Sequence, residues 1–157
     1  MALREIRIEG DEILGKVSKE VKEMTPRLHE LVTDMWDTMH KAEGVGLAAV
    51  QVGVLKRIFV VEVSDEEKCV LVNPVIVDTE GTQEGSEGCL SVPGMAGKVI
   101  RPMKVVMEGF DEDMKPIRVE AEGFFARALC HEYDHLNGHL YTEKVVGDLY
   151  RVDADEE

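Results

Sequence analysis

The chain has 157 residues, of which 44% are hydrophobic and 32% charged. This composition fits one globular domain that is large enough to bury a core. With 18 basic and 32 acidic residues the net charge is −14, which argues against nucleic-acid binding through phosphate neutralisation. No apolar run approaches the length of a membrane span, and charged residues stand where a signal peptide would be apolar. The three cysteines do not indicate a disulfide framework, which leaves thiol chemistry or metal binding.

The first predicted element is a helix over residues 24–43. Thr25 suits the N-cap, Pro26 suits the first helical position, and Gly44 closes the segment. Apolar residues recur within it at helical spacing and are expected to face a core; they are Leu28, Leu31, Val32, Met35, Trp36 and Met39.

The periodicity then changes to that of strands. Residues 57–63 and 69–77 are short and rich in β-branched side chains, which predicts two strands joined by an acidic turn. Residues 99–110 and 115–121 predict a further hairpin. A second helix is expected over 124–137, with Gly138 as its terminator.

Several strands between two helices indicate the α+β class. We expect mostly antiparallel strands packed around the second helix, with the first helix near the N-terminus. No internal repeat or linker divides the chain. The sequence therefore predicts a single catalytic domain over residues 1–150, followed by an acidic, disordered tail over 151–157.

The second predicted helix carries an H-E-x-x-H pattern at residues 131–135. Residues i and i+4 lie on one face of a helix, so His131 and His135 can bind one metal ion while Glu132 stands beside it as a base. The alternative is a pair of solvent-facing histidines on an acidic helix.

Two histidines are an incomplete site, because a catalytic zinc-like centre usually has three protein ligands and one open position. Cys130 is turned about 100° around the helix from His131 and fits better as a small buried residue, as does Cys69 at the start of a strand. His139 lies beyond the helix end. Cys89, in a glycine-rich stretch that we interpret as a loop, could bring a thiolate to a cation. Acidic side chains also remain candidates.

Residues 43–51 form an unusual stretch for a core. Gly44 and Gly46 permit close approach by a ligand, and Gln51 offers an amide donor beside an apolar run. On this stretch alone, a helix end followed by a buried turn is the better interpretation.

Three stretches together resemble, in order and wording, the signature motifs of the peptide deformylases. They read GVGLAAVQ at 44–51, EGCLS at 87–91 and HEYDH at 131–135, and the resemblance extends from about Leu14 to Tyr141. It implies one divalent metal ion bound by three residues, with water in the fourth position. Those residues are Cys89, His131 and His135. The family preference implied is Fe(II), while zinc, nickel and cobalt also suit this donor set.

The reaction implied by the resemblance is hydrolysis of the N-formyl group from the N-terminal methionine of newly made polypeptides, with release of formate. Glu132 is implied as the general base, which takes a proton from water and passes it to the leaving amine. The Gln51 amide and the Leu90 backbone N–H are implied as donors to the oxyanion. Val45 and Gly46 are implied to contact the substrate, whose backbone can pair where residue 46 lacks a side chain.

Charged residues near these motifs have expected roles too. Glu87, Arg101 and Asp134 are expected to fix the Cys89 stretch and the histidines, the alternative being independent surface charges. Arg127 departs from the family pattern, because many members carry an aliphatic residue four positions before the first metal histidine. We favour an outward-pointing guanidinium. The alternative places it in the substrate pocket, with Gly85 leaving room, where it would favour a polar or acidic substrate side chain.

The resemblance also implies partners and a setting. The partner is a formylated nascent peptide, with transient contact to the ribosome, which an acidic tail weakens. We expect a monomer in a bacterial-type cytoplasm, with no direct nucleic-acid or membrane binding. Two other classes are a metallopeptidase, against which Cys89 argues, and an idle metal-stabilised binding module, against which Glu132 and Gln51 argue.

Overall fold

The computed structural model describes residues 2–152. Within them, no helix is both long enough and apolar enough to cross a membrane. In chain order the elements are η1 (Glu12–Gly15), α1 (Pro26–Lys41), β1 (Gly46–Ala48), η2 (Ala49–Val52), β2 (Ile58–Glu62), β3 (Lys68–Glu80), β4 (Gln83–Cys89), β5 (Val92–Arg101), β6 (Lys104–Phe110), β7 (Pro116–Glu122), α2 (Phe124–Leu136), η3 (Tyr141–Glu143) and β8 (Tyr150–Arg151).

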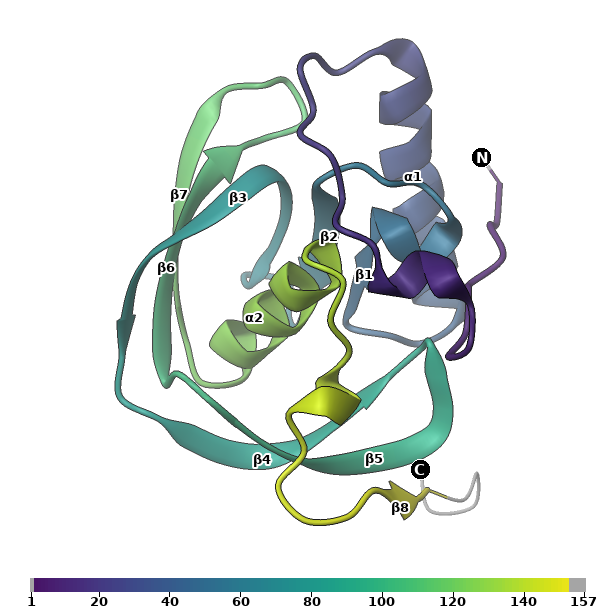
Figure 1. Ribbon diagram of the computed structural model, residues 1–157. Helices are drawn as coiled ribbons and strands as arrows, with labels where there is room; N and C mark the ends of the chain where they lie inside the picture. Colours follow the sequence, from purple (N-terminus) through teal and green to yellow (C-terminus); the bar gives the residue numbers. More distant parts are fainter. Residues whose placement is uncertain (1, 153–157) are drawn as a thin grey trace.

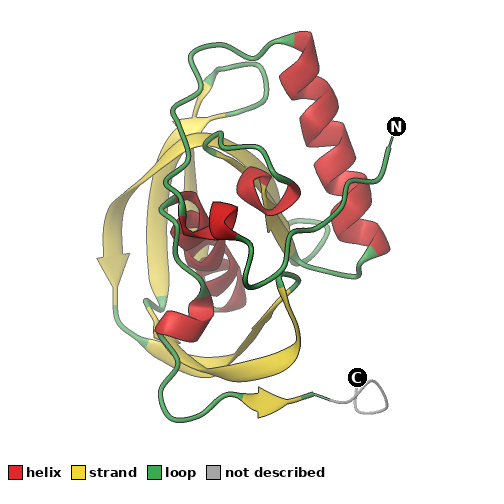
Figure 2. Cartoon of the chain, turned by 45° about the vertical axis from the view of Figure 1, so that its right-hand side comes forward, coloured by secondary structure: helices red, strands yellow, loops and turns green. Residues whose placement is uncertain are grey.

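The strands form two antiparallel sheets around α2. One sheet has the order β1-β2-β3-β6-β7 and the other the order β4-β5-β8. Figure 1 shows α2 in the middle of the molecule, with β3, β6 and β7 along one side and β4 and β5 below it. Helix α1 lies outside this arrangement, which the turned view in Figure 2 also shows. The predicted α+β class, with mostly antiparallel strands around a central helix, is confirmed.

Helix α1 follows its predicted signals closely. The Thr25 side chain accepts a hydrogen bond from the Leu28 N–H (3.2 Å), and Pro26 is the first helical residue. The helix ends at Lys41, two residues before the predicted limit. Its apolar face packs against β1 and β2, where it forms a second core on the outer side of the larger sheet.

The hairpin formed by β2 and β3 is confirmed, but β3 is longer than predicted. Ile58 pairs with Val72, and β3 then continues to Glu80 alongside β6, with two irregularities in the register. Asn73 lies at one of them with φ 52°, and its side chain hydrogen-bonds both the N–H and the carbonyl of Val21 (2.8 Å each). Pairing with a distant strand therefore decides how far β3 extends.

Two sequence-based assignments were wrong. Residues 99–110 do not form one strand, because the chain breaks at Pro102, which has no N–H for the ladder, and thereby divides β5 from β6. The glycine-rich stretch around Cys89 is not a loop over its whole length, because residues 83–89 form β4. Gln83 pairs with Arg101 and the register continues along β5, so sheet pairing overrides the weak strand propensity of glycine.

Helix α2 ends one residue before its predicted limit, at Leu136, and Gly138 follows in the left-handed region with φ 82°. Apolar side chains from both sides cover it, which gives the first core of the protein. This central position explains why α2 also buries charged residues. Arg127, Glu132 and His135 all lie inside the protein.

The predicted tail lies mostly outside the described residues. Its first two residues, however, are paired with β5. Arg151 stands opposite Met95, and the Val152 N–H donates to the Gly94 carbonyl (2.8 Å). The predicted disorder therefore does not describe Arg151 and Val152. For residues 153–157, which lie outside the described residues, it stays a prediction.

Candidate metal centre and pocket

The structure brings Cys89, His131 and His135 together. One potential ligand atom from each residue lies within 4.8 Å of the others. The Cys89 Sγ is 3.3 Å from the His135 Nε2. The two histidines project from one face of α2 and the cysteine from the end of β4, as the predicted ligand set requires.

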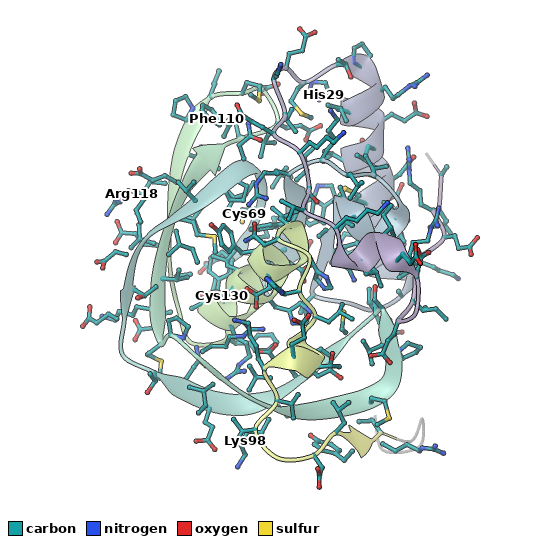
Figure 3. All side chains as sticks on the ribbon, in the orientation of Figure 1. His29, Cys69, Lys98, Phe110, Arg118 and Cys130 are labelled. Carbon is teal, nitrogen blue, oxygen red and sulfur yellow. The ribbon has the colours of Figure 1, made fainter. Side chains whose placement is uncertain are left out.

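The other cysteines lie elsewhere. Figure 3 labels Cys130 on α2 and Cys69 on β3, and neither belongs to the cluster of potential ligands. Burial raises the pKa of Cys130 to about 11 and that of Cys69 to about 12, so both thiols remain protonated. They are packed as small apolar residues, as the sequence predicted.

The donor set fits a single divalent ion. Two ligands of one tetrahedral ion stand roughly 3.5 Å apart, given bonds of about 2.0–2.3 Å, which is close to the observed separation of Cys89 and His135. The His131 Nδ1 donates to Glu87 (2.9 Å), which leaves the Nε2 of His131 available as a ligand. Burial holds the pKa of His135 well below its usual value, so His135 stays neutral, the form that binds metals.

Glu132 lies beside this cluster, and 4% of it is exposed. Its Oε1 is buried and has no hydrogen-bond partner among the described residues. Burial raises the pKa of Glu132 to about 7, although the neighbouring His131 opposes the shift. An unpaired carboxyl with a pKa near neutrality has the properties of a general base.

Glu87 connects the charged residues that were predicted to act together. Its carboxylate accepts two hydrogen bonds from Arg101, at 2.8 and 2.9 Å, and one from the His131 Nδ1. Arg101 also donates to Asp134 (2.6 Å). Burial alone would raise the pKa of Glu87, but hydrogen bonds from Arg101 and His131 hold it well below its usual range. Glu87 and Arg101 are both buried, so the alternative of independent surface charges is wrong.

Arg127 does not point to solvent, so that prediction was wrong. Only 4% of the residue is exposed, and its Nη1 donates to Glu87 Oε2 (2.7 Å), to the Val99 carbonyl (3.0 Å) and to the Gly85 carbonyl (3.3 Å). These three acceptors offset the cost of removing the guanidinium from water. The predicted outward orientation would have avoided that cost by leaving the guanidinium in solvent. Gly85 does leave room, because a Cβ there would lie 3.0 Å from the Arg127 Nη2.

Gln51 is held next to the thiol. Its Oε1 accepts from the Ala48 N–H (2.9 Å), and its Nε2 donates to Ser91 Oγ (3.0 Å) and, more weakly, to Cys89 Sγ (3.6 Å). The Ser91 N–H also points at the Cys89 Sγ (3.4 Å). No role was predicted for Ser91 from the sequence, although its place in the EGCLS stretch is a signal that could have indicated one.

Tyr141 is a second residue of the site for which the sequence predicted no role. Its ring is buried and stacks on His131, with 5.9 Å between ring centroids. It follows α2 in the short η3 helix. Nothing in the local sequence marks it, because only the return of the chain past α2 places the ring there.

A pocket of about 600 Å³ opens onto these residues. One wall is β1 with the residues before it, and β1 stands at the end of its sheet, so one edge of the strand has no strand neighbour. Val45 and Phe124 are exposed apolar residues that line the pocket. The lining includes Gly44, Val45, Gly46, Gln51, Glu87, Cys89, Leu90, Arg127, His131 and Glu132.

A cysteine and two histidines beside an unpaired carboxyl, in a pocket with a free strand edge, define a metallohydrolase class of site. The family model described as polypeptide deformylase matches residues 3–149. A peptide deformylase of Lachnoclostridium phytofermentans is 55% identical over 100% of this chain and 98% of the relative. One of Agathobacter rectalis is 54% identical over 99% of this chain and 98% of the relative.

Solved structures agree with this similarity. A peptide deformylase of Legionella pneumophila superimposes with a TM-score of 0.89 at 43% identity, over 92% of this chain and 87% of that one. One of Ehrlichia chaffeensis, in complex with actinonin, gives 0.90 at 37% identity, over 93% and 90%. The chain belongs to the peptide deformylase family. It is a metal-dependent hydrolase that removes the N-formyl group from the N-terminal methionine of newly made polypeptides and releases formate. Membership of this family excludes the two alternative classes, a metallopeptidase and an idle metal-stabilised binding module.

Proposed function

We propose that Glu132 is the general base of the deformylation, that Cys89, His131 and His135 hold the metal ion, and that Gln51 and the Leu90 N–H stabilise the oxyanion. The observation that carries this proposal is the position of the unpaired Glu132 carboxyl beside the cluster of three potential ligands, inside the pocket.

The metal ion proposed for the three ligands is Fe(II), with zinc, nickel and cobalt also suited to one thiolate and two imidazoles. When bound, a divalent cation supplies Lewis acidity, which makes water more acidic and polarises the formyl carbonyl. His131 contributes through its Nε2, because Glu87 holds the proton of its Nδ1.

Glu132 moves the proton in this proposal. Its carboxylate takes a proton from the attacking water and later gives it to the amine nitrogen that leaves with the methionine. A pKa of about 7 in the buried site supports both steps, since the group then accepts and releases a proton at similar cost near neutral pH.

The developing oxyanion receives hydrogen bonds from Gln51 and Leu90. Both residues line the pocket, and the Gln51 amide is fixed by its Oε1 contact to the Ala48 N–H. Its Nε2 donates to Ser91 Oγ (3.0 Å) and makes a long contact to the Cys89 Sγ (3.6 Å), and we propose that the substrate oxygen replaces the long contact. Donors held in place before the reaction stabilise the transition state without reorganisation.

The substrate backbone pairs with the free edge of β1 at Val45 and Gly46. An extended peptide that adds to a sheet edge obtains main-chain hydrogen bonds at little conformational cost. The Arg127 side chain forms part of the pocket wall, but its Nη1 is committed to Glu87 and two carbonyls. We therefore propose a pocket for an apolar first side chain, as in methionine, instead of an acidic one.

The setting of the reaction is also part of the proposal. A formylated nascent chain as substrate favours a cytoplasmic monomer that meets the ribosome transiently. The net charge of −14 argues against a contact made through phosphate neutralisation.

The test compares formate release from a formyl-methionyl tripeptide with cleavage of the same tripeptide without the formyl group. Glu132→Gln should keep its metal content and lose activity by several orders of magnitude, because one residue serves as base and proton carrier. Glu143→Gln, an exposed residue outside the pocket, is the matched control. Full activity of Glu132→Gln at full metal occupancy would overturn the proposal for the base.

A further inference from the structure

Arg127 stands one helical turn before His131 on α2, and both line the pocket. Its guanidinium nevertheless turns away from the three potential ligands, towards β4 and β5. There it contacts the Gly85 carbonyl, the Val99 carbonyl and the Glu87 carboxylate. Arg127 is therefore connected to His131 through Glu87, in addition to its place on the same helix.

The Glu87 carboxylate is fully occupied. Its Oε2 accepts from the Arg101 Nε (2.8 Å) and the Arg127 Nη1 (2.7 Å). Its Oε1 accepts from the Arg101 Nη2 (2.9 Å) and the His131 Nδ1 (2.9 Å). Four charge-assisted or strongly polar contacts thus fix both oxygens, and only 6% of Glu87 is exposed to water that could replace them.

The two guanidinium groups hold Glu87 from different elements. Arg101 approaches from the end of β5 and also bonds Asp134, while Arg127 approaches from α2, the helix that carries His131. Two carboxylates, of Glu87 and Asp134, therefore face two guanidinium groups. Lys144 also faces Asp134 (3.7 Å), so removal of Arg127 acts mainly on Glu87. It would free one side of Oε2, so the Glu87 carboxylate could rotate away from His131.

Stability alone does not account for this arrangement. The Arg127 Nη2 is buried and has no hydrogen-bond partner among residues 2–152. A buried cation with an unpaired N–H is a poor source of folding stability compared with an apolar side chain of similar size. The guanidinium also fits only closely beside residue 85, where a Cβ would lie 3.0 Å from the Arg127 Nη2.

We propose that Arg127 is a positioning residue for the metal centre. It holds Glu87 Oε2, which keeps Oε1 on the His131 Nδ1 and directs the Nε2 of His131 towards the ion. This inference rests on the proposed ligand set. Contacts of this kind, one step beyond the ligands, typically contribute about 10–100-fold to metal affinity.

The test measures how fast cobalt(II)-loaded protein loses its metal to excess chelator, followed by the cobalt absorption. Arg127→Met, which keeps an unbranched apolar stem but removes the guanidinium, should lose cobalt about 10-fold faster or more. Arg127→Lys should recover part of the difference because it can still bond Glu87. Gly85→Ala should shift the rate in the same direction, since its methyl would crowd the Arg127 Nη2. Arg118→Met, at an exposed arginine, is the control.

A double-mutant cycle separates positioning from a merely structural role. If Arg127 acts through Glu87, Arg127→Met should change the rate of cobalt loss much less in a Glu87→Gln background than in the wild type. An unchanged rate in Arg127→Met, or an equal fold-change in both backgrounds, would overturn the inference. If Arg127→Met does not fold, the Arg127→Lys and Gly85→Ala variants carry the same cycle. Retention of cobalt by Cys89→Ala would instead show that the proposed ligand set is wrong.

Discussion

Gly46 of β1 lies directly against the side chain of Glu132. A Cβ at residue 46 would stand 2.9 Å from the Glu132 Cδ and 3.0 Å from its Cγ. Carbon atoms normally pack no closer than about 3.5 Å, so β1 can approach the carboxyl only because residue 46 has no side chain. The resemblance implies a role of Gly46 towards the substrate, and the structure adds a close contact with the Glu132 side chain.

Gly46→Ala should therefore displace Glu132. The φ of Gly46 is not positive, so the backbone accepts alanine and the effect is steric. We expect kcat to fall by roughly 10²-fold, as for a catalytic group moved by about 1 Å, with the metal retained. Glu132→Gln should then lower kcat by a smaller factor in the Gly46→Ala background than it does in the wild type. An increase in KM alone would show that Gly46 serves only the substrate. Gly15→Ala, where a Cβ meets nothing within 4 Å, is the control.

Gln51→Leu should lower kcat by roughly 10²–10³ with little change in KM, the size expected for a lost oxyanion donor. Because the Gln51 Nε2 also contacts the Cys89 Sγ, metal content has to be measured alongside the kinetics. An equal loss of metal and activity would assign Gln51 to the thiolate and not to the oxyanion.

The metal centre should depend on one cysteine only. Cys89→Ala should lose most of the bound metal, while Cys130→Ala and Cys69→Ala should retain it, because their thiols lie outside the cluster of potential ligands. Metal content per chain checks the three variants, and anomalous scattering from a crystal checks the ligands directly. Density for Cys130 or Cys69 on the ion would contradict the proposal.

Arg101→Leu should strongly destabilise the protein. The guanidinium is buried between Glu87 and Asp134, and breaking such a pair leaves an uncompensated buried charge, which costs roughly 3–5 kcal/mol. Urea unfolding of the metal-free protein measures the loss. Arg118→Leu removes a guanidinium from two ion pairs at the surface, so the two variants should differ clearly. Equal losses would show that the buried network is not what stabilises this region.

The pH dependence of stability should report the proton on Glu132. In the metal-free protein, burial raises its pKa from 4.5 to about 7. The folded state then holds this proton more tightly than the unfolded chain, so the stabilisation is complete below about pH 4.5 and is lost as the pH rises to about 7. Over this interval the free energy of unfolding should fall more in the wild type than in Glu132→Gln. Parallel pH profiles for the two proteins would show that the carboxyl is not perturbed.

The local sequence was sufficient to determine where α1 begins and that the two histidines of α2 share a face. Thr25 and Pro26 set where α1 begins through contacts within one helical turn. His131 and His135 share a face because helical geometry is periodic, so the pair was recognisable before any fold was known. The glycine at 138 ended α2 for the same local reason.

Only the tertiary structure decided what depends on distant contacts. The stretch 83–89 became a strand because β5 pairs with it, and β3 extended because β6 does. Arg127 turned inward for a related reason. Its acceptors come from β4 and β5, about 30 to 40 residues earlier in the chain, and no helical pattern encodes them. Where a side chain can reach either water or a buried acceptor, the fold determines which of the two is available.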